Sequence, residues 1–212
     1  SAARELKSPQ LLTEFQQALE TSGLQLTSIN GFPYGGFHQQ EVKAKVYLPD
    51  WSDQARLRYT KDLADILAAC LPDDCDCGAI STLPLGYKRH WSSAKQRMSI
   101  AHLSILMQYL DKLYQRTGKK ILVCLEMEPD CVLESSVELV DFFQNQVQPH
   151  ILNHQYLAVC YDVCHQAVMH EDAKASLQQI TDADIPIGKI QLSSALKAQF
   201  AGDDSDGRLL SL

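Results

Sequence analysis

The sequence predicts an α/β fold with parallel strands, and three observations support this prediction. Helical and strand-like segments alternate along the chain, and the strand-like segments begin near residues 24, 79, 120, 156 and 187. This spacing leaves room for a crossover helix each time, as parallel strands require. The segment 120–126 is almost continuously apolar, which is typical of a strand covered on both faces. A doubly wound sheet and a (β/α) barrel fit these observations equally well, and a barrel with so few strands would be incomplete in this chain.

The composition is that of a globular protein of 212 residues, with 45% hydrophobic and 21% charged residues, and we place one domain over residues 1–212. The formal net charge of −7 argues against a nucleic-acid partner, because phosphate binding needs a basic face. No run of about 18 apolar residues occurs, so we expect no membrane span. The seven cysteines lie partly in apolar runs, as free buried thiols do. We therefore expect a cytoplasmic protein.

Caps, breakers and apolar periodicity place the elements in order. A first helix begins after Ser8 and Pro9 and ends at Gly23, and Ser135 and Glu138 form a capping box for a later helix. The expected strands are 24–30, 79–83, 120–126, 156–162 and 187–192, and the other expected helices begin near 52, 92 and 171. For the long helix 92–117 the periodicity predicts a core face of Met98, Ala101, Ile105, Tyr109 and Leu113.

A polar residue closes every predicted strand. The carboxyl ends of parallel strands face the ligand site in α/β folds, and polar residues there are disproportionately functional. We therefore expect these residues to meet at one rim of the sheet. They are Asn30, Thr82, Glu126, Asp162 and Gln191.

Two of these strand ends carry groups suited to chemistry. Glu126 follows a buried strand directly, and Glu128 would share its face if the strand continued. Asp162 and His165 place a carboxylate and an imidazole three residues apart at a strand-to-loop junction. Carboxylates with an imidazole and the amide oxygen of Gln191 suit a divalent ion such as Mn²⁺, Mg²⁺ or Zn²⁺. Such an ion could polarise a substrate oxygen while a carboxylate moves protons.

Each of these residues also has a purely structural interpretation. Taken alone, Glu126 could cap a helix or pair with a lysine, and Gln191 could be an ordinary strand-end residue. The two cysteines beside Asp162, Cys160 and Cys164, are interpreted as packing residues. Only the shared location at the strand ends favours a site.

We expect the segment 31–51 to form a long loop with aromatic rings, glycines and an imidazole. Loops of this length in compact domains are usually functional, and aromatic side chains suit a cover over an apolar or ring-shaped ligand. The alternative is a long, ordered surface loop. The residues that we expect to contact a ligand here are Phe32, Tyr34, His38 and Trp51.

Several strings resemble those of the EboE family of metabolite traffic proteins: NGFPYGGFHQQEVKAKVYLPDW, ISTLPLGY, LEMEPDCVLE, VCYDVCHQAV and IPIGKIQLSSAL. The resemblance extends from about residue 25 to 196. It implies a xylose isomerase-like TIM barrel, similar to sugar phosphate isomerases and epimerases. It further implies a place in bacterial gene clusters that make and export secondary metabolites such as scytonemin, with contacts to other proteins of the cluster.

The resemblance also implies roles for individual residues. Glu126 matches a metal ligand and acid/base residue, Asp162 matches a metal ligand, and His165 matches a residue that contacts substrate. Gln191 stands where the wider superfamily usually has a histidine ligand, and its carbonyl oxygen would coordinate more weakly. The first two strands and the final glutamate ligand of that superfamily have no counterpart in this chain.

Two functions remain open at this point. One is a metal-assisted isomerase, epimerase or lyase that acts on a small hydroxylated metabolite, in which Glu126 transfers protons. Asp162 and Gln191 would hold the ion, and His165 would orient the substrate. The other is a module that binds or carries a metabolite in the same pocket without turnover, using Asn30, Thr82 and Glu128 with the aromatic loop.

Overall fold

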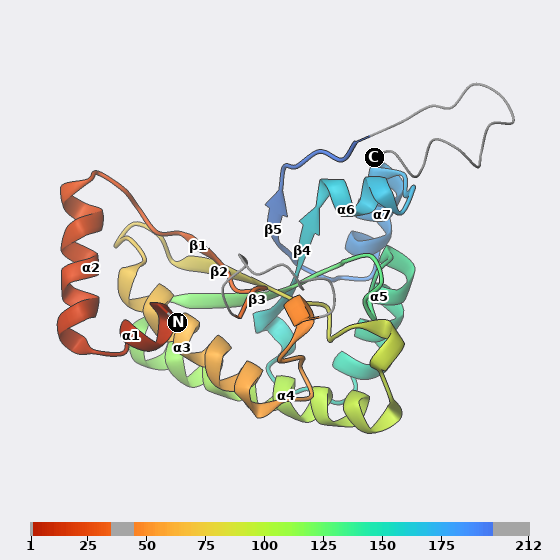
Figure 1. The fold of residues 1–212 in the computed structure, drawn as a ribbon, viewed down its shortest axis with the longest axis horizontal. Coiled ribbons are helices and arrows are strands. Elements are labelled where there is room, and N and C mark those ends of the chain that lie inside the picture. Colours follow the sequence, from red (N-terminus) through yellow and green to blue (C-terminus); the bar gives the residue numbers. More distant parts are fainter. Residues whose placement is uncertain (1, 35–44, 197–212) are drawn as a thin grey trace, which may run out of the picture.

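The computed structural model describes residues 2–34 and 45–196. These residues form one sheet of five parallel strands in the order β1-β2-β3-β4-β5. The sheet curls into a half-barrel, with β4 and β5 turned up from the plane of β1 to β3 (Figure 1). The strands are β1 (Ser28–Asn30), β2 (Cys77–Thr82), β3 (Lys120–Glu126), β4 (Leu157–Asp162) and β5 (Ile187–Gln191).

Helices connect the strands and cover the outer face of the sheet, where α3 and α4 lie side by side beneath it (Figure 1). The longer helices are α2 (Pro9–Thr21), α3 (Gln54–Cys70), α4 (Ser93–Thr117) and α7 (Ala173–Asp182). The shorter ones are α1 (Ala2–Glu5), α5 (Ser136–Phe142), α6 (Val163–Val168), the 3-10 turns η1 (Lys45–Tyr47), η2 (Lys88–His90) and η4 (His154–Tyr156), and the π-helical turn η3 (Phe143–Val147).

The helix boundaries follow from local capping. Asp53 caps α3 by accepting a hydrogen bond from the backbone N–H of Ala55, and the predicted capping box of Ser135 and Glu138 begins α5. The long helix α4 ends at Gly118, whose φ of 69° lies in the left-handed region that glycine tolerates. The fold class and the order of elements predicted from the sequence are therefore confirmed.

The two faces of the sheet differ in character. On the outer face, residues such as Val123, Leu125 and Val159 pack into one large core with the helices. On the inner, concave face the side chains are small or contain thiols, with Ala79, Cys124, Ala158 and Cys160 forming a separate cluster. The side chains on the concave face are therefore short, and the strands end in polar residues on this face.

A β-bulge in β5 decides which of its residues face inward. Ile187 pairs with Val159 on the outer face, whereas Lys189 pairs with Cys160 on the inner face, so Gly188 is one residue extra. A Cβ atom on Gly188 would lie 2.6 Å from the Sγ atom of Cys124, which explains why this position is glycine. The sheet is therefore curled so tightly that β5 touches β3 across β4.

The predicted core face of α4 is wrong in most of its positions. Met98 and Ile105 are exposed, at 49% and 45%, and only Leu113 of the predicted stripe is fully buried. The helix is apolar on more than one side, so periodicity alone selected a stripe rotated from the true one. The buried residues are Ser99, His102, Leu103, Leu106, Met107, Leu110 and Leu113.

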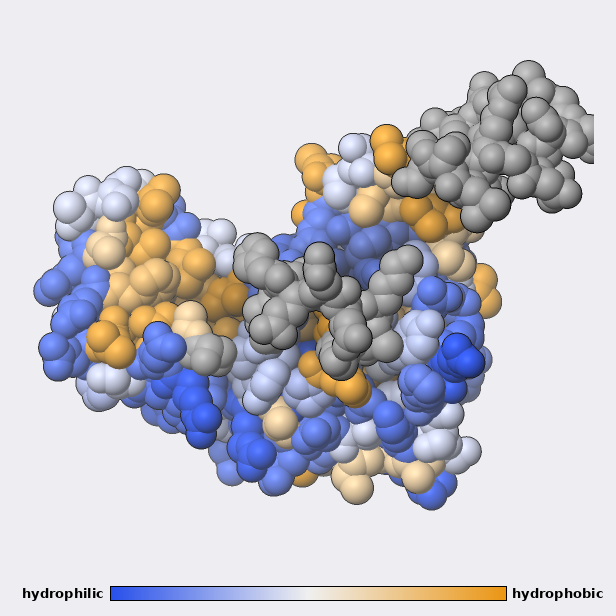
Figure 2. All heavy atoms as spheres, viewed as in Figure 1, coloured by the Kyte–Doolittle hydropathy of each residue, from blue (hydrophilic) through white to orange (hydrophobic). Residues whose placement is uncertain are grey.

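The surface carries an apolar region beside β1. Helix α2 has no fully buried residue, and Figure 2 shows apolar side chains gathered where α2 and the segment before β1 lie. Leu11 and Leu24 are among the exposed residues. Within the described residues, no helix is both long enough and apolar enough to cross a membrane.

Candidate functional site

Three predicted residues meet at the carboxyl ends of β3, β4 and β5. The Nε2 atom of Gln191 donates hydrogen bonds to Oε1 of Glu126 and to Oδ2 of Asp162, each 2.8 Å long. The side chains of Glu126 and Asp162 are almost fully buried. One amide thus joins two carboxylates that would otherwise repel each other at close range.

His165 forms the fourth part of this cluster. It lies on α6, which begins directly after β4 and is capped by the side chain of Asp162. Its Nδ1 atom lies 2.9 Å from the carbonyl oxygen of Met127, and its Nε2 atom lies 3.0 Å from Oε2 of Glu128. Because both partners are acceptors, both ring nitrogens serve as donors and the ring is an imidazolium.

The pKa values of the two central carboxyl groups are shifted in opposite directions. Burial raises the pKa of Glu126 and the charge of Asp162 adds to that, and together they outweigh the opposing effects of the charge of His165, the Ser81 hydroxyl and the hydrogen bond from Gln191. Burial would also raise the pKa of Asp162, but hydrogen bonds from Ser193, the Cys164 N–H and Gln191 bring it below its ordinary value. Glu126 is therefore the residue suited to exchanging protons, and Asp162 the one suited to holding a constant charge.

The charges around His165 explain why it is in the imidazolium form. Burial alone would lower its pKa, but the hydrogen bond and charge of Glu128, with the charge of Asp162, raise it to about 9. His165 is therefore positively charged at neutral pH, and it lies between the carboxylates of Glu126 and Glu128.

Two cysteines near the site are packing residues. Burial raises the pKa of Cys124 to about 12 and also raises that of Cys160, so neither is a thiolate at neutral pH. Cys164 contributes its backbone N–H to Asp162. Burial of Cys160 agrees with its interpretation as a packing residue, whereas Cys164 is only half-buried and its packing role stays a prediction.

Thr82 does not join the cluster. It pairs with Leu125, so it lies on the outer face of β2, buried against the core. Its predecessor Ser81 pairs with Cys124 and lies on the inner face, where its Oγ donates to Oδ1 of Asn30 over 3.3 Å. The prediction chose the last residue of the strand, whereas side-chain alternation places the residue before it in the site.

The aromatic loop residues have separate positions. Phe32 is buried in the main core and lies 6.1 Å from the ring of Tyr47. Trp51 is fully enclosed, with its carbonyl oxygen accepting from Nδ1 of His102. Tyr34 packs on Tyr59 and lines a different cavity, on α3. His38 falls outside the described residues.

Arg56 of α3 orders the start of this loop. Its buried guanidinium donates to the carbonyl oxygens of Gly31 and Pro49, at 2.8 and 2.9 Å, and its charge lies over the rings of Tyr34 and Tyr59. Burial lowers the pKa of Arg56 to about 10. The arginine therefore fixes the chain on both sides of the undescribed residues 35–44.

A tyrosine pair that the sequence did not single out lies near Glu128. Tyr47 and Tyr87 stack with ring centroids 5.3 Å apart and planes 13° apart. Burial raises the pKa of Tyr47, and the charges of Cys131, Glu128 and Asp130 add to this rise.

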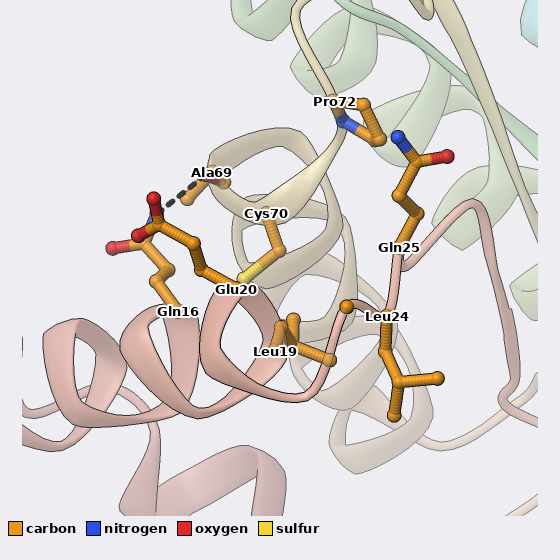
Figure 3. A pocket seen from close by; sticks show the side chains of 9 residues that line it. Gln16, Leu19, Glu20, Leu24, Gln25, Ala69, Cys70 and Pro72 are labelled. Carbon is orange, nitrogen blue, oxygen red and sulfur yellow. Dashed lines mark hydrogen bonds between the residues drawn. The ribbon is translucent and has the colours of Figure 1, made fainter.

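A further cavity lies at the opposite end of the strands. It has a volume of about 570 Å³ and lies between the carboxyl-terminal turns of α2 and α3, next to Gln25 and Pro72 (Figure 3). A hydrogen bond of 2.6 Å from Gln16 to the carbonyl oxygen of Ala69 crosses it. None of the predicted site residues lines this cavity.

The carboxylate cluster has donors that fit a divalent metal ion. Oε2 of Glu126 is buried and has no hydrogen-bond partner among the described residues. Candidate ligand atoms of Glu126, Glu128 and His165 lie within 4.8 Å of one another, as do those of Asp162, Cys164 and His165, and His165 would become a ligand only after losing a ring proton. Against this, Gln191 directs its nitrogen, rather than its oxygen, at both carboxylates.

No protein-family model matches the chain, and no curated protein matches it in sequence. Solved structures do match it. A D-tagatose 3-epimerase-like protein aligns with a TM-score of 0.57 and 14% identity over 87% of this chain and 61% of that one. The apo form of the 3-keto-D-glucoside 4-epimerase YcjR from E. coli aligns with a TM-score of 0.50 and 13% identity, over 89% of this chain and 79% of that one.

The chain thus spans about three fifths of the length of the first of these proteins. At such identities the similarity extends to the fold alone, and the epimerase activities belong to the matched proteins. Their strands and helices correspond to the curled parallel sheet and its outer helices. Over its described residues, the chain has the fold of part of a (β/α) barrel, a fold that it shares with these two structures.

Proposed function

We propose that this protein is a metal-assisted isomerase or epimerase-like enzyme that acts on a small hydroxylated metabolite. The observation that carries the proposal is the pair of buried carboxylates, Glu126 and Asp162, whose pKa values are shifted in opposite directions on neighbouring strand ends. Two carboxyl groups whose pKa values differ in this way are suited to different roles in one reaction.

In this proposal Glu126 and Asp162 hold the ion, together with the amide oxygen of Gln191, which would replace the nitrogen now facing them. A divalent ion, Mn²⁺, Mg²⁺ or Zn²⁺, would stabilise negative charge on a substrate oxygen when bound. Glu126 would remove a proton from the carbon next to a carbonyl group and return it to the former carbonyl carbon, while the hydroxyl proton moves to the carbonyl oxygen. Inversion at the first carbon would instead need a second proton donor, such as water, on the opposite face. His165 donates a hydrogen bond to a substrate oxygen, and Glu128 keeps it charged.

The finer assignment is an EboE-like role in metabolite traffic, within a bacterial cluster for secondary metabolites. It is supported by the strings from residue 25 to 196, which include all four cluster residues. The sugar epimerases that share the fold support the reaction class. Small-molecule partners and contacts with other proteins of such a cluster belong to this proposal, as does a cytoplasmic location.

A second candidate is a binding or carrier module that uses the same pocket without turnover. The specific observation that favours it is the orientation of Gln191, whose amide nitrogen donates to both carboxylates from the position that an ion would take. In that case Glu126 and Asp162 would accept hydrogen bonds from ligand hydroxyl groups, and no proton would move to carbon.

Metal analysis with a matched control tests the proposal. Purified protein is dialysed with Mn²⁺, Zn²⁺ or Mg²⁺, and bound metal is measured for the wild type, Asp162→Ala and Asp74→Ala. Asp74 is exposed and offers the same loss of charge. We expect about one ion per chain in the wild type and in Asp74→Ala, and loss of it in Asp162→Ala.

A deuterium-exchange experiment separates the enzyme from the carrier. The protein is incubated in D₂O with a panel of ketoses and sugar acids, and incorporation of deuterium at carbon is followed by NMR. The enzyme predicts incorporation that Glu126→Gln abolishes. A protein without metal, which binds a ligand and leaves its C–H bonds unexchanged, would establish the carrier instead.

A further inference from the structure

Lys189 lies on the concave face of the sheet because of the bulge in β5. It pairs with Cys160 on β4, and Cys160 in turn pairs with Glu126 on β3. Lys189 precedes Gln191 by two residues and lies on the same face of the sheet. Had β5 continued in the register of Ile187 and Val159, Lys189 and Gln191 would both face the helices. The bulge thus brings a cation and an amide into the site together.

The lysine side chain extends across the floor of the half-barrel. Its Nζ atom lies 3.5 Å from Oγ of Ser81, although Ser81 is on β2 and two strands separate it from β5. The floor beneath it consists of thiols and small apolar groups, Cys124, Ala158 and Cys160. These neighbours give the ammonium group no opposite charge.

The carboxylates of the site do not neutralise Lys189 either. Within residues 2–34 and 45–196, no carboxylate oxygen lies within the 4.0 Å of Nζ that defines an ion pair, and the ion-pair partner of Glu126 is His165. The contact with Ser81 is long for a hydrogen bond and engages one of three N–H groups. A half-buried cation in such surroundings favours a ligand that supplies an anion.

A second donor, the side-chain amide of Asn30, lies next to Ser81. Ser81 donates to Oδ1 of Asn30, and the backbone N–H of Phe32 donates to the same oxygen over 3.1 Å. These bonds orient the Asn30 amide, so that Nδ2 points away from both donors, and among the described residues Nδ2 has no hydrogen-bond partner. Asn30 on β1 and Lys189 on β5 therefore offer donors to a ligand, and Ser81, whose one proton goes to Asn30, lies between them beside the carboxylates of β3 and β4.

We propose that Asn30 and Lys189, on either side of Ser81, bind the anionic group of the substrate, so that the ligand is a hydroxylated metabolite carrying one carboxylate or phosphate. The location of the ligand rests on the proposed function, because its hydroxyl groups must face Glu126 and Asp162. The two sources of anion share the chemistry of oxygen atoms that accept hydrogen bonds from an ammonium group. A neutral sugar would leave Lys189 unpaired.

Binding of three probes tests this inference. Gluconate, glucose 6-phosphate and glucose are titrated into the metal-loaded protein, and the dissociation constants are measured by calorimetry or ligand-observed NMR. We expect one of the two anions to bind about tenfold or more tightly than glucose, because hydrogen bonds to charged groups are the stronger kind. Which anion is preferred identifies the source as carboxylate or phosphate.

Variants of Lys189 test whether this residue causes the preference for anions over glucose. Lys189→Met keeps an unbranched side chain about as long as the aliphatic part of lysine and removes the charge, and Lys189→Gln keeps a donor without the charge. Both variants should reduce the preference for the anion to less than about threefold and leave glucose binding unchanged. Lys174→Met removes a charge from an exposed position on α7 and should keep the preference.

Equal binding of all three probes by the wild type, failure of both anions to bind, or an unchanged preference in folded Lys189→Met would overturn the inference. Bound metal is measured in the same samples. Lys189→Met should retain the ion that Asp162→Ala loses, so loss of anion preference alone and loss of metal alone report on the two proposals separately.

Discussion

Replacing Glu128 by glutamine removes the negative charge that lies 3.0 Å from Nε2 of His165. The folded-state pKa of His165, about 9, is above the ordinary value of 6.5. The stabilisation from this charge is therefore fully present below about pH 6.5 and is lost as the pH rises through about 9. The difference between the two values corresponds to at most about 3 kcal/mol.

Both side chains are partly exposed, 20% for His165 and 22% for Glu128, so solvent screening reduces that maximum. We expect Glu128→Gln to lower the free energy of unfolding by about 1–2 kcal/mol at pH 6 and by much less at pH 9.5. Urea unfolding at both values measures the difference, and Asp74→Asn serves as a control with the same change of charge. Imidazole titration by NMR provides an independent measurement.

A His165 ring that titrates at or below pH 6.5 in the wild type would refute this reasoning, because the ion pair would then be too weak to hold the charge. The same loss of stability at both pH values would also refute it, since a packing defect does not depend on the protonation of His165. A fall of the His165 pKa in Glu128→Gln would support the assigned role of Glu128.

Three further predictions concern the fold and the metal. Gly188→Ala places a Cβ 2.6 Å from Sγ of Cys124 and should lower the free energy of unfolding by about 1–3 kcal/mol, and Cys124→Ala in the same chain should restore part of it. Leu106→Ala should lower the free energy of unfolding by about 2–5 kcal/mol, measured by thermal or urea unfolding, whereas Ile105→Ala, at an exposed position, should change it by about 0.5 kcal/mol or less. Equal losses in the two variants would mean that the assigned core face of α4 is wrong. Gln191→His offers an imidazole to the ion and should tighten Zn²⁺ binding, measured by competition with a chelator, and weaker binding would count against an ion between the carboxylates.

The sequence predicted best where a local signal and the tertiary fold agree. The strand 120–126 was predicted with its observed ends, because a buried parallel strand is a continuous apolar run that stops at a polar residue. Its terminal residue Glu126 does meet Asp162, Gln191 and His165, because parallel strands bring their carboxyl ends to one edge. Topology was enough to bring these residues together.

The sequence failed where a property depends on exact alternation or on neighbours distant in the chain. Thr82 and Ser81 differ by one position and lie on opposite faces, and strand length alone does not decide between them. The inward direction of Lys189 depends on a bulge that no residue pattern announced. Trp51 is enclosed by the core, although its aromatic context predicted a ligand contact.

The extra residue in β5 decides which face of the sheet each later residue of that strand points to. Adding or removing one residue at this point exchanges the odd and even positions, so an amide and an ammonium group leave the site as Ile190 enters it. A substitution changes one side chain, whereas a single-codon insertion or deletion here would exchange the whole set at once. The chemistry of such a barrel can therefore be altered in one step by changing the count of residues rather than their kind.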